Sequence, residues 1–185
     1  AEELYDKYIE EQIAVQNDGS IDPAIDVFND IKLVLELRKS PENQNFPLYV
    51  ANIDSERFYI IPITGNGLWN AIWGYISLKE DLNTVKGVVF DHAQETAGLG
   101  AEITQDWFKE RFINEKLFDS DNNLIGITVS KTNNDPNNED KEDFEVDAIS
   151  GATITGDGVT DMIKERLEHY VPYLNTLRSN KIALN

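Results

Sequence analysis

The chain of 185 residues has no cysteine and only two histidines. Without cysteine it forms no disulfide within the chain and offers no thiolate to a metal, an iron–sulfur cluster or a thioether-linked cofactor. The histidines, His92 and His169, lie far apart in the sequence. Because no third histidine exists, a metal site built on histidine is not expected.

Basic residues are also scarce. There are 16 Lys and Arg against 34 Asp and Glu, which gives a formal net charge of −18. Such a charge repels phosphate backbones and anionic lipid, so nucleic acid is not expected as a partner. No stretch reaches the ~18 consecutive apolar residues of a membrane helix. Since the first residue is Ala1 rather than Met, the sequence leaves open what precedes it.

The apolar fraction of 41% is ordinary for a packed core, and the length suggests one domain, with or without an extended arm. We predict an α+β fold, a single domain whose twisted, largely antiparallel sheet or sheets are flanked by helices. Residues 1–45 would form an N-terminal helix and a connecting arm, and residues 46–173 the main domain. Residues 174–185 have no strong pattern and are predicted to be a C-terminal tail.

Alternating and β-branched patterns place the strands. They are predicted within Phe46–Ile63, on either side of a turn at Asp54-Ser55, with Pro47 and Pro62 bounding them. Further strands are predicted at Trp73–Leu78, Val85–Phe90 and Leu124–Val129. The acidic stretch Lys131–Asp143 is interpreted as a solvated hairpin tip.

Helical spacing indicates helices at both ends and one between them. The N-terminal helix is predicted from Leu4, Tyr5, Tyr8, Ile9 and Ile13. A short helix is predicted from Thr104, its N-cap, to Phe112, with Trp107, Phe108 and Phe112 buried. The last helix is predicted from about Asp157 to Tyr170, ending before Pro172. Its apolar stripe comprises Val159, Met162, Ile163, Leu167 and Tyr170.

Two glycine-rich stretches begin like a dinucleotide-binding fingerprint but lack its third glycine. Asn70 holds that position after Gly65-Asn66-Gly67, and Ile103 holds it after Gly98-Leu99-Gly100. The first stretch also leads into a strand, so the phosphate-binding helix is missing. Ser150 lacks the flanking glycines of a nucleophile elbow, and a hydrolase triad is not indicated.

The stretch DAISGATITGDGV, residues 147–159, crowds hydroxyl and small residues at the mouth of the last predicted helix. A helix N-terminus offers unpaired N–H groups and partial positive charge to a phosphate. Gly151 and Ala152 would let the backbone approach, and Ser150, Thr153 and Thr155 would add hydroxyl donors. The stretch predicts a phosphate site, with an ordinary threonine cap beside flexible glycines as the alternative.

The net charge sharpens this prediction, because the protein must hold an anionic group against its own field. A covalent bond would remove the problem of dissociation. A threonine hydroxyl does not attack unaided, since its pKa lies far above neutrality, and the stretch contains no His, Lys or Cys to activate it. We therefore expect a separate enzyme to supply the base and the metal for the attachment.

Residues 150–155, SGATIT, resemble the S-G-A-T-x-T flavinylation motif of FMN-binding domains in bacterial electron-transfer complexes. In that family the last threonine carries FMN through a phosphoester bond, and the matching position is Thr155. The resemblance implies that Ser150, Gly151, Ala152 and Thr153 shape the phosphate seat. Asp147, upstream, fits what the flavin transferase of the family reads.

A second block, ETAGLG at residues 95–100, is similar to the family's E-T-P-G-L-G segment, which lies against the isoalloxazine ring. Ala97 replaces the usual proline. The resemblance implies hydrogen bonds from Glu95 and Thr96 to the polar edge of the ring and an apolar contact from Leu99, beside Gly98. Leu68 and Trp69 could contribute. The alternatives are a surface-turn carboxylate for Glu95 and a core position for Trp69.

A third block, residues 65–87, is similar to the C-subunit family of Na+-translocating NADH:quinone oxidoreductases. The G subunits of Rnf complexes share the other two blocks. The resemblance implies covalent FMN and one-electron transfer between partner subunits of a respiratory membrane complex, without independent turnover. It also implies maturation by a flavin transferase and a periplasmic position, tethered to the inner membrane by an N-terminal helix absent from this chain. An Rnf-type subunit and a non-redox module that binds a phosphorylated ligand or a partner protein remain alternatives.

Overall fold

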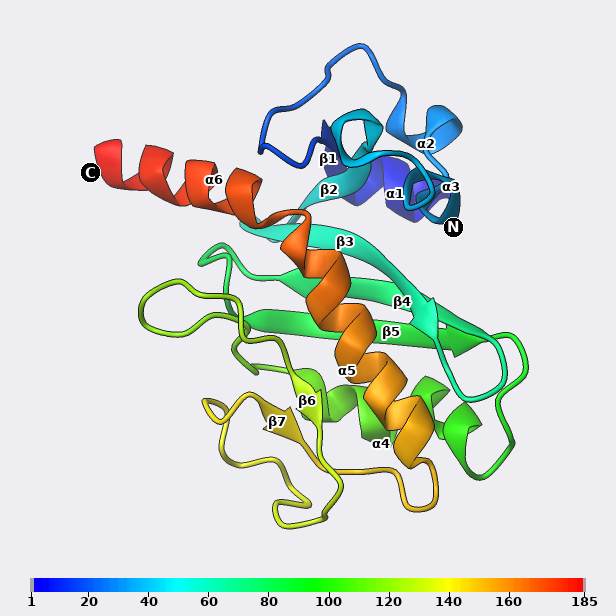
Figure 1. The fold of residues 1–185 in the computed structure, drawn as a ribbon. Coiled ribbons are helices and arrows are strands. Elements are labelled where there is room, and N and C mark those ends of the chain that lie inside the picture. Colours follow the sequence, from blue (N-terminus) through cyan, green and yellow to red (C-terminus); the bar gives the residue numbers. More distant parts are fainter. Residues whose placement is uncertain (1, 185) are drawn as a thin grey trace.

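The main sheet has five antiparallel strands in sequence order, as the computed structural model of the chain shows (Figure 1). The structure describes residues 2–184. The strands are β1 (Ile9–Val15), β2 (Phe46–Ile53), β3 (Glu56–Asn66), β4 (Ala71–Leu78) and β5 (Val85–His92). Helices accompany the sheet, so the predicted α+β class with a largely antiparallel sheet is confirmed.

The β2–β3 turn forms where the sequence places it. Asp54 and Ser55 have positive φ values of 53° and 68°, which match the right-handed twist of a tight hairpin. The prolines, however, lie inside the strands rather than at their limits. Pro47 pairs with Ala14 of β1. Pro62 lies beyond Ile60, where pairing with β2 ends, so only β4 pairs with that part of β3.

The first predicted helix is too long. The structure has α1 (Glu2–Tyr8) followed at once by β1, which contains Ile9 and Ile13. Two residues four apart share one face of a helix and also one face of a strand, so their spacing does not separate the two structures. Pairing of β1 with β2 decides for the strand. The short helices α2 (Val27–Asp30), α3 (Leu33–Glu36) and η1 (Pro41–Asn43) connect β1 to β2.

The helix α5 (Thr153–Glu168) crosses the sheet and packs against β3 (Figure 1). Its predicted apolar stripe is confirmed, because every member is buried in the core: Val159, Met162, Ile163, Leu167 and Tyr170. The Tyr170 hydroxyl donates a hydrogen bond of 2.7 Å to the Pro47 carbonyl. The helix begins four residues earlier than predicted, so Thr153 and Thr155 lie in its first turn.

Pro172 opens another helix instead of ending the chain's regular structure. It lies in the first turn of α6 (Val171–Ala183), where its missing N–H removes no hydrogen bond. Residues 174–183, predicted to be a patternless tail, are therefore helical. Of the helices within residues 2–184, none is long and apolar enough to cross a membrane.

The predicted helix 104–112 is divided into η2 (Gly100–Thr104), α4 (Asp106–Lys109) and η3 (Glu110–Phe112). The N-cap of α4 is Gln105, and the Thr104 hydroxyl donates instead to the Ala101 carbonyl. Phe108 and Phe112 are buried as predicted, but Trp107 is 43% exposed. The Arg111 guanidinium lies 4.8 Å from the centre of the Trp107 ring and provides a cation–π contact at the surface.

The acidic loop joins two parallel strands and is therefore not a hairpin tip. These are β6 (Thr128–Val129) and β7 (Glu145–Val146). The predicted strand 124–129 shrinks to β6, because Gly126 has a positive φ of 84° that interrupts extended backbone. The loop is also anchored, since Asn138 is buried and its side chain donates to Glu115 Oε1 at 2.6 Å.

Glu115 is a fully buried carboxyl group beneath this loop. Lys141 Nζ lies 3.8 Å from Oε1, and Oε2 has no hydrogen-bond partner among the described residues. Burial raises the pKa of Glu115 from 4.5 to about 7, although the Asn138 hydrogen bond and Lys141 lower it. The charges of Asp140 and Asp143 raise the pKa further. Glu115 therefore costs stability whenever it is ionised.

Replacing Glu115 with Gln is expected to stabilise the protein at pH 8 by about 2 kcal/mol and to have no effect near pH 4. The pKa is higher in the folded than in the unfolded state, so the stability of the native protein falls as pH rises from 4.5 to about 7. Urea unfolding across this range measures the effect. Glu142→Gln, on the exposed part of the same loop, is the control. A constant difference between Glu115→Gln and the native protein at all pH values would contradict the interpretation.

Candidate functional site

A cavity of about 240 Å³ lies at the start of α5. The turn between β3 and β4, the segment after β5 and the first turn of α5 meet there, although they are distant in the sequence (Figure 1). The lining residues are Leu68, Glu95, Thr96, Leu99, Gly100, Gly151, Ala152, Thr153, Ile154 and Thr155. The two motif blocks that the sequence singles out thus form one site.

Thr155 and Glu95 are in direct contact in this cavity. The Thr155 hydroxyl donates a hydrogen bond of 2.5 Å to Glu95 Oε2. Both side chains are buried, with 1% of Thr155 and 7% of Glu95 exposed. Glu95 is therefore not a surface-turn carboxylate, and its side chain is directed at the hydroxyl that the motif marks.

Backbone N–H groups hold the Glu95 carboxylate in place. Those of Leu68 and Trp69 donate to Oε2 and Oε1 at 3.2 and 3.0 Å. The Glu95 N–H in turn donates to Nδ1 of His92, the last residue of β5. Burial alone raises the pKa of Glu95, but the hydrogen bonds from Thr155, Trp69 and Leu68 prevail and lower it. The group is ionised at neutral pH.

Two glycines leave the room that this contact needs. A Cβ at Gly100 would lie 2.4 Å from Thr155 Oγ1 and 2.6 Å from Glu95 Oε2. Gly151 has a positive φ of 75°, and a Cβ there would lie 2.9 Å from Leu99 Cδ2. A side chain at either position would therefore fill the cavity or displace its wall.

The first turn of α5 presents free N–H groups to the cavity. Ala152 is the N-cap residue and makes no side-chain capping bond, so the ordinary threonine cap is not observed. The N–H groups of Thr153, Ile154 and Thr155 have no acceptor within the helix. The first turn contains no acidic residue, which leaves the positive end of the helix dipole uncompensated.

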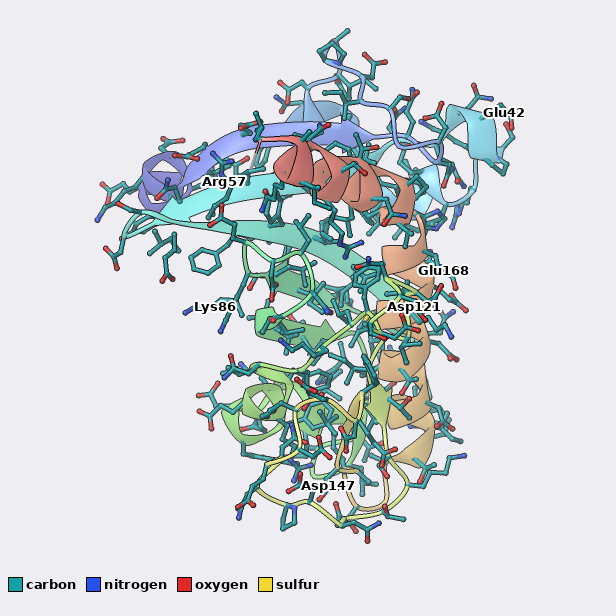
Figure 2. The ribbon with its side chains drawn as sticks, turned by 90° about the vertical axis from the view of Figure 1, so that its left-hand side faces the viewer. Glu42, Arg57, Lys86, Asp121, Asp147 and Glu168 are labelled. Carbon is teal, nitrogen blue, oxygen red and sulfur yellow. The ribbon has the colours of Figure 1, made fainter. Side chains whose placement is uncertain are left out.

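The loop before α5 is fixed from below. Arg111 Nη1 donates to the carbonyls of Asp147 and Ala148 at 2.8 and 3.2 Å. Asp147 Oδ1 accepts the N–H groups of Asn134 and Asp135, both at 3.2 Å. Figure 2 shows Asp147 at the same end of the molecule as the start of α5, whereas Glu168 lies at the far end of that helix. These contacts join the acidic loop to the approach to Thr155.

Three of the predicted site residues do not line the cavity. Ser150 is exposed on the preceding turn. The Gly98 N–H donates to Glu102 Oε1. Trp69 is 65% exposed, and so not in the core, and its indole N–H donates to Thr96 Oγ1 at the rim at 3.2 Å.

Two lining residues, Gly100 and Ile154, escaped the sequence prediction. Both lie inside the quoted blocks ETAGLG and SGATIT, so membership of a block was the available signal. Within residues 2–184, no group of three or more His, Asp and Glu residues is placed to hold a metal.

Comparison with known proteins identifies the family. The model of the FMN-binding domain matches residues 67–168, which is more than half of the chain and contains the whole cavity. The chain therefore belongs to the FMN-binding domain family.

Its relatives are C subunits of a respiratory enzyme. The chain is 38% identical over 122 residues to the C subunit of the Na(+)-translocating NADH-quinone reductase of Neisseria meningitidis serogroup A, covering 65% of this chain and 45% of that protein. It is 34% identical over 148 residues to the corresponding protein of Vibrio anguillarum, covering 78% and 54%. The chain thus spans about half the length of these curated relatives.

Solved structures agree with the fold. The crystal structure of the C subunit of this reductase from Parabacteroides distasonis superimposes with a TM-score of 0.80 at 34% identity, covering 94% of this chain and 81% of that one. The structure of NqrC from Shewanella oneidensis superimposes with a TM-score of 0.75 at 24% identity, covering 96% and 88%, and it supports the fold alone.

Proposed function

We propose that Thr155 carries FMN through a phosphoester bond, and that the chain is an electron-carrier subunit of a Na+-translocating NADH:quinone oxidoreductase. The observation that carries the proposal is the position of the Thr155 hydroxyl in a cavity formed by both motif blocks. Membership of the FMN-binding domain family and similarity to C subunits support it.

The cavity fits a phosphate ester in charge and size. The N–H groups of the first turn of α5 point a partial positive charge at the attachment oxygen. Thr153 and the glycine backbones of residues 100 and 151 line the space around it. A volume of about 240 Å³ is smaller than most ligand pockets, which reach roughly 300–1,000 Å³. It would seat the linkage and phosphate and leave the flavin ring at the rim.

Exposed apolar side chains at that rim are suited to contact the ring. Leu68 is 45% exposed and Leu99 40% exposed, and Trp69 is held beside Thr96. Bound FMN would supply the one-electron chemistry, while these residues orient the ring and keep it near the surface. A ring in that position can exchange electrons with a neighbouring subunit. Glu95 faces the attachment oxygen instead of the rim.

The partners follow from the same similarity. We propose that the chain works with the other subunits of the membrane complex and is matured by a flavin transferase. The relatives are named as subunits of a reductase, which supports the first part. Their family further suggests an N-terminal membrane anchor and a periplasmic position for the domain. An Rnf-type complex would use the same cofactor site with different partners.

Coexpression with and without the flavin transferase tests the proposal. With the transferase, the protein should remain yellow and fluorescent after acid precipitation, and its intact mass should rise by one FMN-derived adduct. Without the transferase, both signals should be absent. Flavin that binds reversibly and is released by acid in both samples would instead favour a module that binds a phosphorylated ligand.

A further inference from the structure

The hydroxyl of Thr155 has an activating group after all. Nothing within residues 147–159 can take its proton, but Glu95, 60 residues earlier in the chain, accepts a hydrogen bond of 2.5 Å from it. A base must be within hydrogen-bond reach of the proton it removes, and Glu95 Oε2 satisfies this condition. The contact is buried, so water does not compete for either group.

The Glu95 carboxylate is also rigidly oriented. The N–H groups of Leu68 and Trp69 bind its two oxygens, and a Cβ at Gly67 would lie 2.6 Å from Oε1. Gly100 closes the other side, beside Oε2. A carboxylate confined in this way has no other hydroxyl within its hydrogen-bond set than that of Thr155.

We propose that Glu95 is the general base of the flavin attachment, so that the acceptor chain and not the transferase supplies this catalytic residue. The proposal rests on the function proposed above. Thr155 Oγ1 attacks the FMN phosphorus of a phosphoanhydride of FMN held by the transferase, and an O–P bond forms. The P–O bond to the leaving phosphate breaks, and that phosphate keeps the electron pair. The Thr155 proton passes to Glu95 Oε2, and nothing is oxidised or reduced.

The transferred proton also solves an electrostatic problem. Attachment places a phosphate anion against a buried carboxylate, and two like charges in one site repel strongly. Because Glu95 has just gained the proton, it is neutral at that moment and can donate a hydrogen bond toward the new ester. The N–H groups at the start of α5 then bind the phosphate charge.

The test compares Glu95→Gln with the native chain, using purified transferase and its FMN donor. The rate of attachment at saturating acceptor should fall about 100-fold or more, within the range usual for a lost general base. The KM for the acceptor chain should stay unchanged. The ratio of native to variant rate should shrink as pH rises, because hydroxide can then replace the missing base. A purely structural role would lower the rate by the same factor at every pH.

Two controls keep the outcome decisive. Glu110→Gln removes the same charge from the exposed side of η3 and should leave the rate within about twofold, as surface changes usually do. Glu95→Asp retains a carboxylate in a shorter side chain, and it should react faster than Glu95→Gln with the pH dependence of the native chain. If Glu95→Gln does not fold, Glu95→Asp decides: a variant that folds but reacts with a changed pH dependence overturns the proposal.

The failures are distinguishable. If native protein acquires no flavin on Thr155, the proposed function itself is wrong. If native protein and Glu95→Gln are modified at equal rates, the function stands and only the role of Glu95 is overturned.

Discussion

Replacing Thr155 with Ala is expected to abolish the covalent flavin completely while leaving the protein folded. The substitution removes the only atom that the proposed phosphoester uses. Glu95 loses one hydrogen-bond donor but keeps those from Leu68 and Trp69, so the loss of stability should be limited to about 1–2 kcal/mol. Flavin fluorescence of the denatured protein, after coexpression with the transferase, measures the outcome.

Matched variants separate attachment from simple loss of packing. Thr153→Ala removes a hydroxyl from the same helical turn and should still be flavinylated, because Thr153 is exposed and makes no bond to Glu95. Thr155→Ser retains a hydroxyl and should acquire flavin, although more slowly. Acid-stable flavin on Thr155→Ala would reject Thr155 as the attachment residue.

Replacing Gly158 with Ala is expected to lower the free energy of unfolding by about 3 kcal/mol, the upper end of the usual cost of overpacking. A Cβ at this position would lie 2.2 Å from the Asn66 carbonyl oxygen of β3, and neither backbone can yield without moving α5 off the sheet. The better helix propensity of alanine offsets about 1 kcal/mol of the clash, and this is included in the expected value.

Equilibrium unfolding in urea measures the effect of Gly158→Ala. Gly87→Ala is the control, because a Cβ at Gly87 meets nothing within 4 Å and should change stability little. The start of α5 carries Thr155, so we also expect slower flavin attachment in Gly158→Ala. Equal stability of the two variants would show that the approach of α5 to β3 is looser than the structure indicates.

The strands and the apolar stripe of α5 were predictable because their patterns are local. Alternation in β4 and the turn at Asp54-Ser55 define the hairpins without reference to the rest of the chain. Ile9 and Ile13 were misassigned because their spacing satisfies both periodicities. Pro172 was misread because proline is unfavourable inside a helix but suited to its first turn.

The candidate site was predictable in its residues but not in its contacts. The motif blocks placed Thr155 and Glu95 in one site, since both belong to segments associated with the same cofactor. A motif does not specify which partner a side chain faces. The hydrogen bond between Thr155 and Glu95 joins residues 60 positions apart, and it depends on Gly100 leaving room for it. Only the folded structure shows that pairing.

The most direct test is a peptide map of the protein isolated, within its complex, from the cells that make it. We predict one FMN phosphodiester, located by fragmentation to Thr155 in the peptide that contains SGATIT. An unmodified Thr155 in that preparation, or flavin attached to another residue, would contradict the account.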